Sequence, residues 1–169
     1  MPVTSIIVMG VSGCGKSTIG RGLAEALHWP FRDGDEFHPP ANVAKMSAGT
    51  PLTDADRWPW LDRIGDFIDQ TTASHAHAVI ACSALKRSYR DRLSAGGRAV
   101  HFAHLQGTFD LIAGRMAARR DHFMPTTLLK SQFATLEPLS PDERAIIVDI
   151  TQPPQAIIAD IVSALQLTC

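Results

Sequence analysis

The sequence predicts an α/β fold: a doubly wound, parallel sheet of five strands with helices on both faces. Four short segments are mostly apolar and lack the regular alternation of a sheet with one face in water. They are residues 6–9, 78–83, 100–105 and 145–150, and segment 30–33 can supply a fifth strand. Helical patterns lie between them, as is typical of parallel sheets. Ligands of such sheets bind at the carboxyl ends of the strands, so we expect the functional residues there.

The expected helices follow from apolar residues that recur every three or four positions. The first helix begins near residue 16 and repeats Ile19, Leu23 and Leu27. Further apolar stripes lie within residues 60–68, 111–116 and 157–165. Thr53, followed by Asp56 three residues later, has the spacing of a helix N-cap with a capping box.

Composition excludes several classes of protein. The formal net charge of −1 gives no electrostatic reason to bind nucleic acid or an anionic membrane. No apolar run approaches the roughly 20 residues of a membrane span, and the N-terminal run lacks the basic region of a signal peptide. The three cysteines are widely spaced, which predicts no disulfide framework, no metal site and a reducing, cytoplasmic location. Without a repeat or linker, residues 1–169 are expected to form one domain.

The strongest motif is GVSGCGKST, residues 10–18, which fits the phosphate-binding pattern G-x-x-x-x-G-K-[ST] between a strand and a helix. Its glycines let backbone N–H groups turn toward phosphate oxygens, and the helix adds its positive end. We expect Lys16 to meet the β- and γ-phosphates of ATP and Ser17 to coordinate Mg²⁺. A chance glycine loop is the alternative, which the strand–loop–helix context disfavours. The predicted nucleotide-binding residues are Gly10, Val11, Ser12, Gly13, Cys14, Gly15, Lys16, Ser17 and Thr18.

A P-loop alone does not distinguish switches and motors from kinases of small molecules. Switches and motors usually end a further strand in a carboxylate that helps to hold Mg²⁺. Here the candidate strand 78–82 ends in Ser83, without an acid. The acids must therefore come from another part of the chain.

Asp33 and Asp35, in the segment DGDEFHPP, are the acids that a kinase needs. If residues 30–33 form the second strand, both acids emerge at its carboxyl end, on one face of an extended segment. We expect Asp33 to act near Mg²⁺ or its water shell, and Asp35 to accept the proton of the acceptor hydroxyl. The alternative is an acidic surface turn. The two prolines that follow are expected to prevent an immediate helical continuation.

Four stretches, in order, resemble the gluconokinase family. They are GVSGCGKSTIG, FRDGDEFHPPANVAKMSAGTPLTDADRWPWL, CSALKRSYRDRL and ARRDHFMPTTLLKSQFATLEPL, within roughly residues 6–150. The first is common to P-loop proteins, whereas the second and SQFATLEPL are distinctive of this family. The D-x-D pair is also similar to that of shikimate kinase.

The resemblance implies a P-loop kinase of the nucleoside and shikimate kinase type, with a mobile lid. It implies transfer of the γ-phosphate of ATP to the 6-hydroxyl of D-gluconate, and it suggests a homodimer. Asp121 stands where many relatives have glycine, beside Arg119 and Arg120, with one of which it can pair.

Gluconate carries a carboxylate and five hydroxyls, so its site needs a cation and several hydrogen-bonding groups. Ser83 follows the third strand, and Lys86 and Arg90 are spaced to share a helix face. The residues assigned to the acceptor are Asp35, His38, Arg57, Ser83, Lys86, Arg90 and His122, with Lys45 as a further candidate. Alternatives are that Arg57 pairs with Asp54 within its own helix and that Lys45 is a solvated lysine.

Arg115 and Arg119 share a helix face by their four-residue spacing. We expect them to belong to a lid over about residues 115–128 that closes on ATP, excludes water and brings charge to the transferring phosphoryl group. Arg115 is assigned to the nucleotide and Arg119 to catalysis. The alternatives are a solubilising role for the arginines and core packing for His122.

Two other functions remain open on the residues alone. The chain could phosphorylate another acceptor, such as shikimate, a nucleoside or a cofactor precursor. It could also be a nucleotide-dependent binding module without transfer chemistry, although the D-x-D pair and the lid arginines disfavour this.

Overall fold

A five-stranded sheet, parallel throughout, forms the centre of the computed structural model, which describes residues 3–118 and 126–167. The strand order is β2-β3-β1-β4-β5, so the predicted parallel sheet is confirmed, including its short second strand. The strands are β1 (Ser5–Met9), β2 (Phe31–Asp33), β3 (Ala78–Ala81), β4 (Val100–Gln106) and β5 (Ala145–Asp149).

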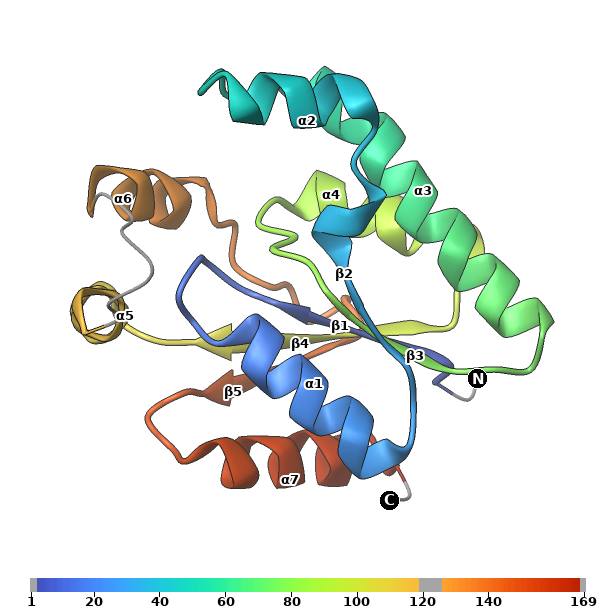
Figure 1. The fold of residues 1–169 in the computed structure, drawn as a ribbon. Helices are drawn as coiled ribbons and strands as arrows, with labels where there is room; N and C mark the ends of the chain where they lie inside the picture. The colour runs from blue at the N-terminus through green and yellow to red at the C-terminus, as the bar shows by residue number, and fades with distance from the viewer. Residues whose placement is uncertain (1–2, 119–125, 168–169) are drawn as a thin grey trace.

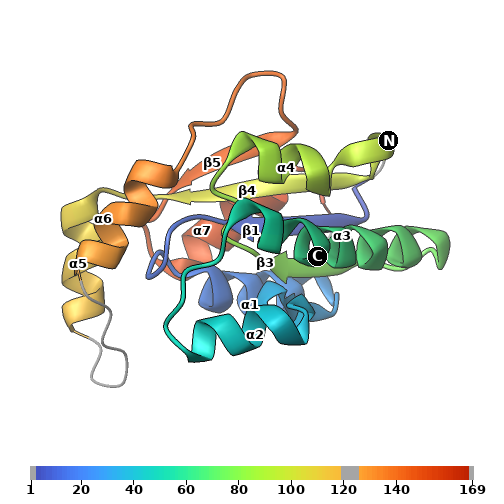
Figure 2. The same ribbon diagram turned by 90° about the horizontal axis from the view of Figure 1, so that it is seen from above.

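Helices cover both faces of this sheet (Figure 1). One face carries α1 (Lys16–Leu27) and α7 (Pro154–Ala164), and the other carries α3 (Asp54–Ala73) and α4 (Arg87–Leu93). Two helices, α5 (Phe109–Ala117) and α6 (Thr126–Thr135), lie beyond the carboxyl ends of the strands (Figures 1 and 2). The remaining helices are α2 (Pro40–Ser47) and the 3-10 helices η1 (Gly34–Phe37) and η2 (Ala95–Gly97).

The apolar core has two parts, one on each face of the sheet. Ile6 and Val8 of β1 belong to the cluster beneath α1 and α7, whereas Ile7 and Met9 belong to the cluster beneath α3 and α4. All four side chains are completely buried. Because successive side chains of a strand point to opposite faces, a strand covered on both faces must be apolar at every position. This explains the continuous apolar run at the N-terminus.

The starts of two helices follow local sequence signals. The side chain of Thr53 accepts a hydrogen bond from the backbone N–H of Asp56, and Asp56 returns one to the N–H of Thr53, so the predicted capping box is confirmed. The 3-10 helix η1 ends at Phe37, before the two prolines, and a separate helix, α2, begins at Pro40. Proline is tolerated in the first helical position, where its missing N–H would have no partner within the helix.

Arg90 is a residue of α4 whose side chain is buried in the core and does not form part of an exposed acceptor wall. Its side chain is 0% exposed, and its Nε lies 2.6 Å from Oε1 of Glu143, which is itself 5% exposed. The guanidinium also donates to the carbonyls of Ala84, Leu85 and Glu137. Its donors are therefore used in holding the segment before β5 against the start of α4. The prediction that Arg90 contacts the acceptor is wrong for this reason.

We expect Arg90→Met to lower the free energy of unfolding by about 3–5 kcal/mol, because it leaves Glu143 buried without its partner. Arg92→Met is the matched control, since the ion pair of Arg92 with Asp62 has side chains that are 43% and 50% exposed. The control should change the stability much less, because exposed ion pairs contribute little. Urea unfolding of both variants measures the difference, and equal losses would contradict the structural role of Arg90.

Candidate active site

The phosphate loop joins β1 to α1 and has the backbone conformation that its glycines predict. Gly10, Gly13 and Gly15 have φ angles of 145°, 81° and 100°, which side-chain-bearing residues rarely adopt. Gly13 is also tightly packed, because a Cβ there would lie 2.6 Å from Cγ of Met116 in α5. Substitution at Gly13 would therefore both strain the loop and push against the side chain of Met116.

The amino end of α1 is open toward an anion. Gly15 forms the N-cap without a side-chain hydrogen bond, and the first turn contains no acidic residue. First-turn N–H groups of a helix lack partners within the helix and attract phosphate. The ammonium of Lys16 lies over the loop, where it donates to the carbonyls of Gly10 at 3.0 Å and Val11 at 3.1 Å.

Asp33 and Asp35 reach the site by a tighter turn than predicted. Asp33 ends β2 and caps η1, with its Oδ1 accepting a hydrogen bond from the N–H of Asp35 at 3.0 Å. The segment is therefore a 3-10 turn and not an extended strand, and the expected geometry of D-x-D is corrected. Glu36 completes the capping box and pairs with Arg32 at 3.0 Å, and its side chain is exposed.

Gly34 lets this turn lie directly against β3. A Cβ at Gly34 would be 2.5 Å from the carbonyl oxygen of Ala81, a distance that real Cβ atoms do not show. The carbonyl of Gly34 accepts a hydrogen bond of 2.8 Å from Nε1 of Trp60 in α3. The turn is thus held between β3 and α3, where Trp60 is itself buried.

A cleft of about 450 Å³ brings the phosphate loop, the two aspartates and Ser83 together. Nine of the residues that line the cleft were predicted site residues: Ser12, Gly13, Gly15, Lys16, Ser17, Thr18, Asp33, Asp35 and Ser83. The other lining residues are Ala81, Cys82, Met116 and Gln132. Gly10, Val11 and Cys14 belong to the loop but do not line the cleft.

Sequence reasoning did not assign Gln132, which holds the phosphate loop from α6. Its Oε1 accepts from the N–H of Ser12 at 2.6 Å, and its Nε2 donates to the hydroxyl of Ser12 at 2.9 Å. Gln132 lies in the SQFATLEPL stretch that resembles the gluconokinase family, and this was the available signal.

The cleft changes the acidity of two groups. Desolvation by surrounding atoms and the charge of Asp33 raise the pKa of Asp35, while His38 and Lys16 act in the opposite direction. The Asp35 side chain is nevertheless 85% exposed, so it is crowded at the cleft wall but open to a ligand. Burial raises the pKa of the Cys82 thiol to about 12, which makes it a poor nucleophile despite its position.

The predicted acceptor cations Arg57 and Lys86 come together around Asp54. Lys86 Nζ lies 3.0 Å and 3.1 Å from the two carboxylate oxygens of Asp54, and Arg57 lies 3.7 Å from it. The hydroxyl of Tyr89, which sequence reasoning did not assign, donates to the same carboxylate at 2.5 Å. The expected alternative, that Arg57 pairs with Asp54, is therefore present. Neither cation lines the 450 Å³ cleft.

The predicted lid is described only in part. Arg115 donates to the carbonyl of Ile150 at 2.6 Å, which ties α5 to the segment after β5. Arg119, Asp121 and His122 lie outside the described residues, so the lid and its roles stay predictions. Lys45 pairs with Asp56 at 2.7 Å rather than lying free in solvent.

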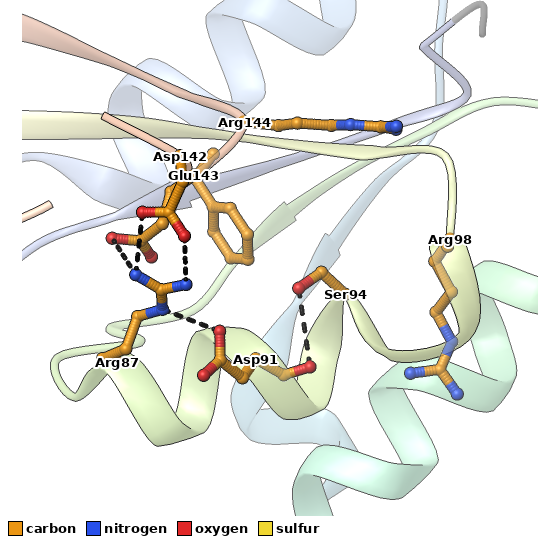
Figure 3. A pocket seen from close by; sticks show the side chains of 9 residues that line it. Arg87, Asp91, Ser94, Arg98, Asp142, Glu143 and Arg144 are labelled. Carbon is orange, nitrogen blue, oxygen red and sulfur yellow. Dashed lines mark hydrogen bonds and ion pairs between the residues drawn. The ribbon is translucent and has the colours of Figure 1, made fainter. Parts of the chain in front are cut away.

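A second hollow, of about 200 Å³, lies beside α4 and is lined largely by charged residues, several of which pair with one another (Figure 3). Arg87 donates to Asp142 at 2.8 Å and 3.1 Å and to Asp91 at 2.7 Å. Within residues 3–118 and 126–167, no three His, Cys, Asp or Glu side chains form a metal cage, and no helix is long and apolar enough to cross a membrane.

We expect Gly34→Ala to lower the free energy of unfolding by about 1–3 kcal/mol, because the added methyl forces the D-x-D turn away from β3. Gly114→Ala is the matched control, since a Cβ at Gly114 in α5 meets nothing within 4 Å. Alanine in a helix interior should there stabilise by up to about 1 kcal/mol. Thermal and urea unfolding compare the two, and a neutral Gly34→Ala would show that the turn is not in tight contact with β3.

Known proteins resemble this chain over nearly its whole length. The shikimate kinase family matches residues 12–166. A gluconokinase from Gluconobacter oxydans is 47% identical over 162 residues, which cover 95% of this chain and 90% of that protein. A gluconokinase structure from Sinorhizobium meliloti superposes with a TM-score of 0.84 at 48% identity, covering 96% of this chain and 91% of that one. An unliganded sugar kinase from a Janibacter species gives a TM-score of 0.90 at 47% identity, covering 99% and 96%. This chain is therefore a P-loop kinase of the gluconokinase family, within the wider shikimate kinase family.

Proposed function

We propose that this protein transfers the γ-phosphoryl group of ATP to the 6-hydroxyl of D-gluconate, giving 6-phosphogluconate and ADP. The observation that carries the proposal is the cleft in which Lys16 and the phosphate loop lie with Asp33 and Asp35. A phosphate cradle beside a carboxylate open to solvent is what transfer to a hydroxyl requires. Membership of the gluconokinase family supports gluconate as the acceptor.

The chain's own residues have distinct tasks in this transfer. Backbone N–H groups of the phosphate loop and of the first turn of α1 bind the phosphates. Lys16 exchanges its two carbonyl partners for the transferring phosphoryl group, whose charge it neutralises. Asp35 orients the acceptor hydroxyl and takes its proton on a carboxylate oxygen, as the new O–P bond forms and the bond to the β-phosphate oxygen breaks.

The cleft also fits a magnesium ion. Mg²⁺ keeps several waters and binds proteins through one or two oxygen ligands together with substrate phosphates, so a full cage of side chains is not needed. Ser17 and Asp33 line the same cleft, and Oδ1 of Asp33 accepts a hydrogen bond from the backbone N–H of Asp35. We assign the ion to Ser17 and, directly or through water, to Asp33. When bound, it would neutralise charge on the β- and γ-phosphates.

The proposed acceptor wall consists of Arg57, Lys86 and Ser83, with Asp54 between the two cations. Asp54 already receives hydrogen bonds from Lys86 and Tyr89, so the carboxylate of gluconate would share or replace these contacts. Arg115, Arg119 and His122 are proposed to close over the nucleotide as a lid. We further propose that the enzyme works in the cytoplasm as a homodimer.

Asp35→Asn should lower kcat by roughly 10²–10⁴-fold with little change in KM for ATP, because the amide cannot accept the proton. Lys16→Met should also lower turnover by orders of magnitude. Asp160→Asn, an exposed acid on α7, is the matched control for the loss of a charge. Coupled assays of ADP release with gluconate measure all three. Full activity of Asp35→Asn would exclude its role as the base.

D-gluconate should be phosphorylated with a kcat/KM at least about 10³-fold above that of sorbitol or glucose, because an acceptor without the carboxylate cannot compete with Asp54 for the charges of Arg57 and Lys86. Shikimate, whose ring is rigid, should also fail. Lys86→Met should raise KM for gluconate far more than KM for ATP. Product analysis by mass spectrometry identifies the phosphorylated species. Comparable rates on sorbitol and gluconate would instead indicate a general polyol kinase.

A further inference from the structure

A buried histidine lies directly behind the proposed base. The side chain of His38 is 4% exposed, and its Nε2 lies 3.9 Å from Oδ1 of Asp35. Its ring stacks on Trp60 with centroids 4.2 Å apart and planes 15° from parallel. Because Trp60 is in turn hydrogen-bonded to Gly34, the ring is held in a fixed plane relative to the D-x-D turn.

Asn42 sets the direction in which this ring can donate. Its side-chain nitrogen lies 2.9 Å from the backbone carbonyl of Asp56, which can only accept, so this atom is the amide NH₂. The same nitrogen lies 3.2 Å from Nδ1 of His38. Nδ1 must therefore accept, and a neutral ring carries its proton on Nε2, the atom that faces Asp35.

The surroundings keep this arrangement in place. Asn42 is 3% exposed, and Asp56, to whose backbone it is anchored, is fixed by the capping box and by Lys45 at 2.7 Å. Burial, which outweighs the effect of Asp35, lowers the pKa of His38, so the ring is neutral near pH 7. Asp35 is the exposed and movable partner, and catalytic hydrogen bonds are often long before the substrate binds.

We propose that Asn42 is a positioning residue that fixes the Nε2–H form of His38, which in turn orients the carboxylate of Asp35 toward the acceptor hydroxyl. One carboxylate oxygen receives the Nε2–H, and the other is left for the acceptor. His38 acts in this scheme behind Asp35 and not as a direct acceptor contact. The inference rests on the proposed function for its catalytic consequence, but the tautomer is a property of the unliganded protein.

The first measurement needs no variant and no substrate. Long-range ¹⁵N–¹H NMR of histidine-labelled protein distinguishes protonated from unprotonated ring nitrogens. We expect Nδ1 of His38 to be unprotonated and Nε2 to be protonated. In Asn42→Asp, a near-isosteric change that replaces the donor by an acceptor, the proton should move to Nδ1. Lys45→Met, which loosens the same helix, should leave the tautomer unchanged. An Nδ1–H ring in the wild-type protein overturns the proposal whatever the enzyme phosphorylates.

The second measurement separates positioning from general destabilisation. Asn42→Asp should lower kcat with gluconate by about 10- to 100-fold, with KM for ATP within about twofold, since a misdirected ring repels rather than orients Asp35. His38→Gln retains an amide donor near the Nε2 position and has no tautomer. The effect of Asn42→Asp should therefore disappear in the His38→Gln background.

An equal loss of kcat from Asn42→Asp in both backgrounds would overturn the proposal, because a structural defect does not depend on the tautomer. If Asn42→Asp does not fold, Asn42→Ala removes the donor to Nδ1 without adding a charge, and it should lose the preference for the Nε2–H form. If the wild-type protein fails to phosphorylate gluconate, the proposed function is refuted. The NMR measurement would still decide the tautomer, because it needs no substrate.

Discussion

Parallel pairing of β1 with β3, and of β3 with β2, brings the phosphate loop and the aspartates to one edge of the sheet. Each of these strands ends where a functional segment begins, so the cleft exists because three carboxyl ends coincide. The contact of Gly34 with the carbonyl of Ala81 makes this coincidence close, since any larger residue would push the acids outward. The geometry of the site thus depends on the close contact between the backbones of Gly34 and Ala81 more than on any one charged pair.

Charges around the cleft are arranged in two different ways. Lys16 and Asp35 are open to a ligand, whereas Arg57 and Lys86 are partly neutralised by Asp54. The partial neutralisation lowers the cost of holding two cations close together before an anionic acceptor arrives. It also means that an acceptor carboxylate must compete with an internal one, which favours ligands that make several hydrogen bonds at once.

Arg90 is a polar residue that supports the site from the core, and we propose a supporting role behind Asp35 for His38. The fully buried guanidinium of Arg90 joins the segment before β5 to the segment before α4 through Glu143 and backbone carbonyls of both segments. Leaving such an ion without its partner is costly, so the contacts define one position for that segment. His38 works at shorter range, because its ring is stacked, hydrogen-bonded on one nitrogen and directed at Asp35 by the other.

The sequence by itself determined the sheet, the phosphate loop and the presence of two acids near it, because these depend on local patterns. Apolar runs reveal strands buried on both faces, and glycines at positive φ reveal the loop. Only the tertiary structure decided that D-x-D is a capped turn, that Arg90 is buried and that Gln132 reaches Ser12 from 120 residues away. Spacing along a chain shows which side chains share a face, but burial and long-range hydrogen bonds depend on what packs against that face.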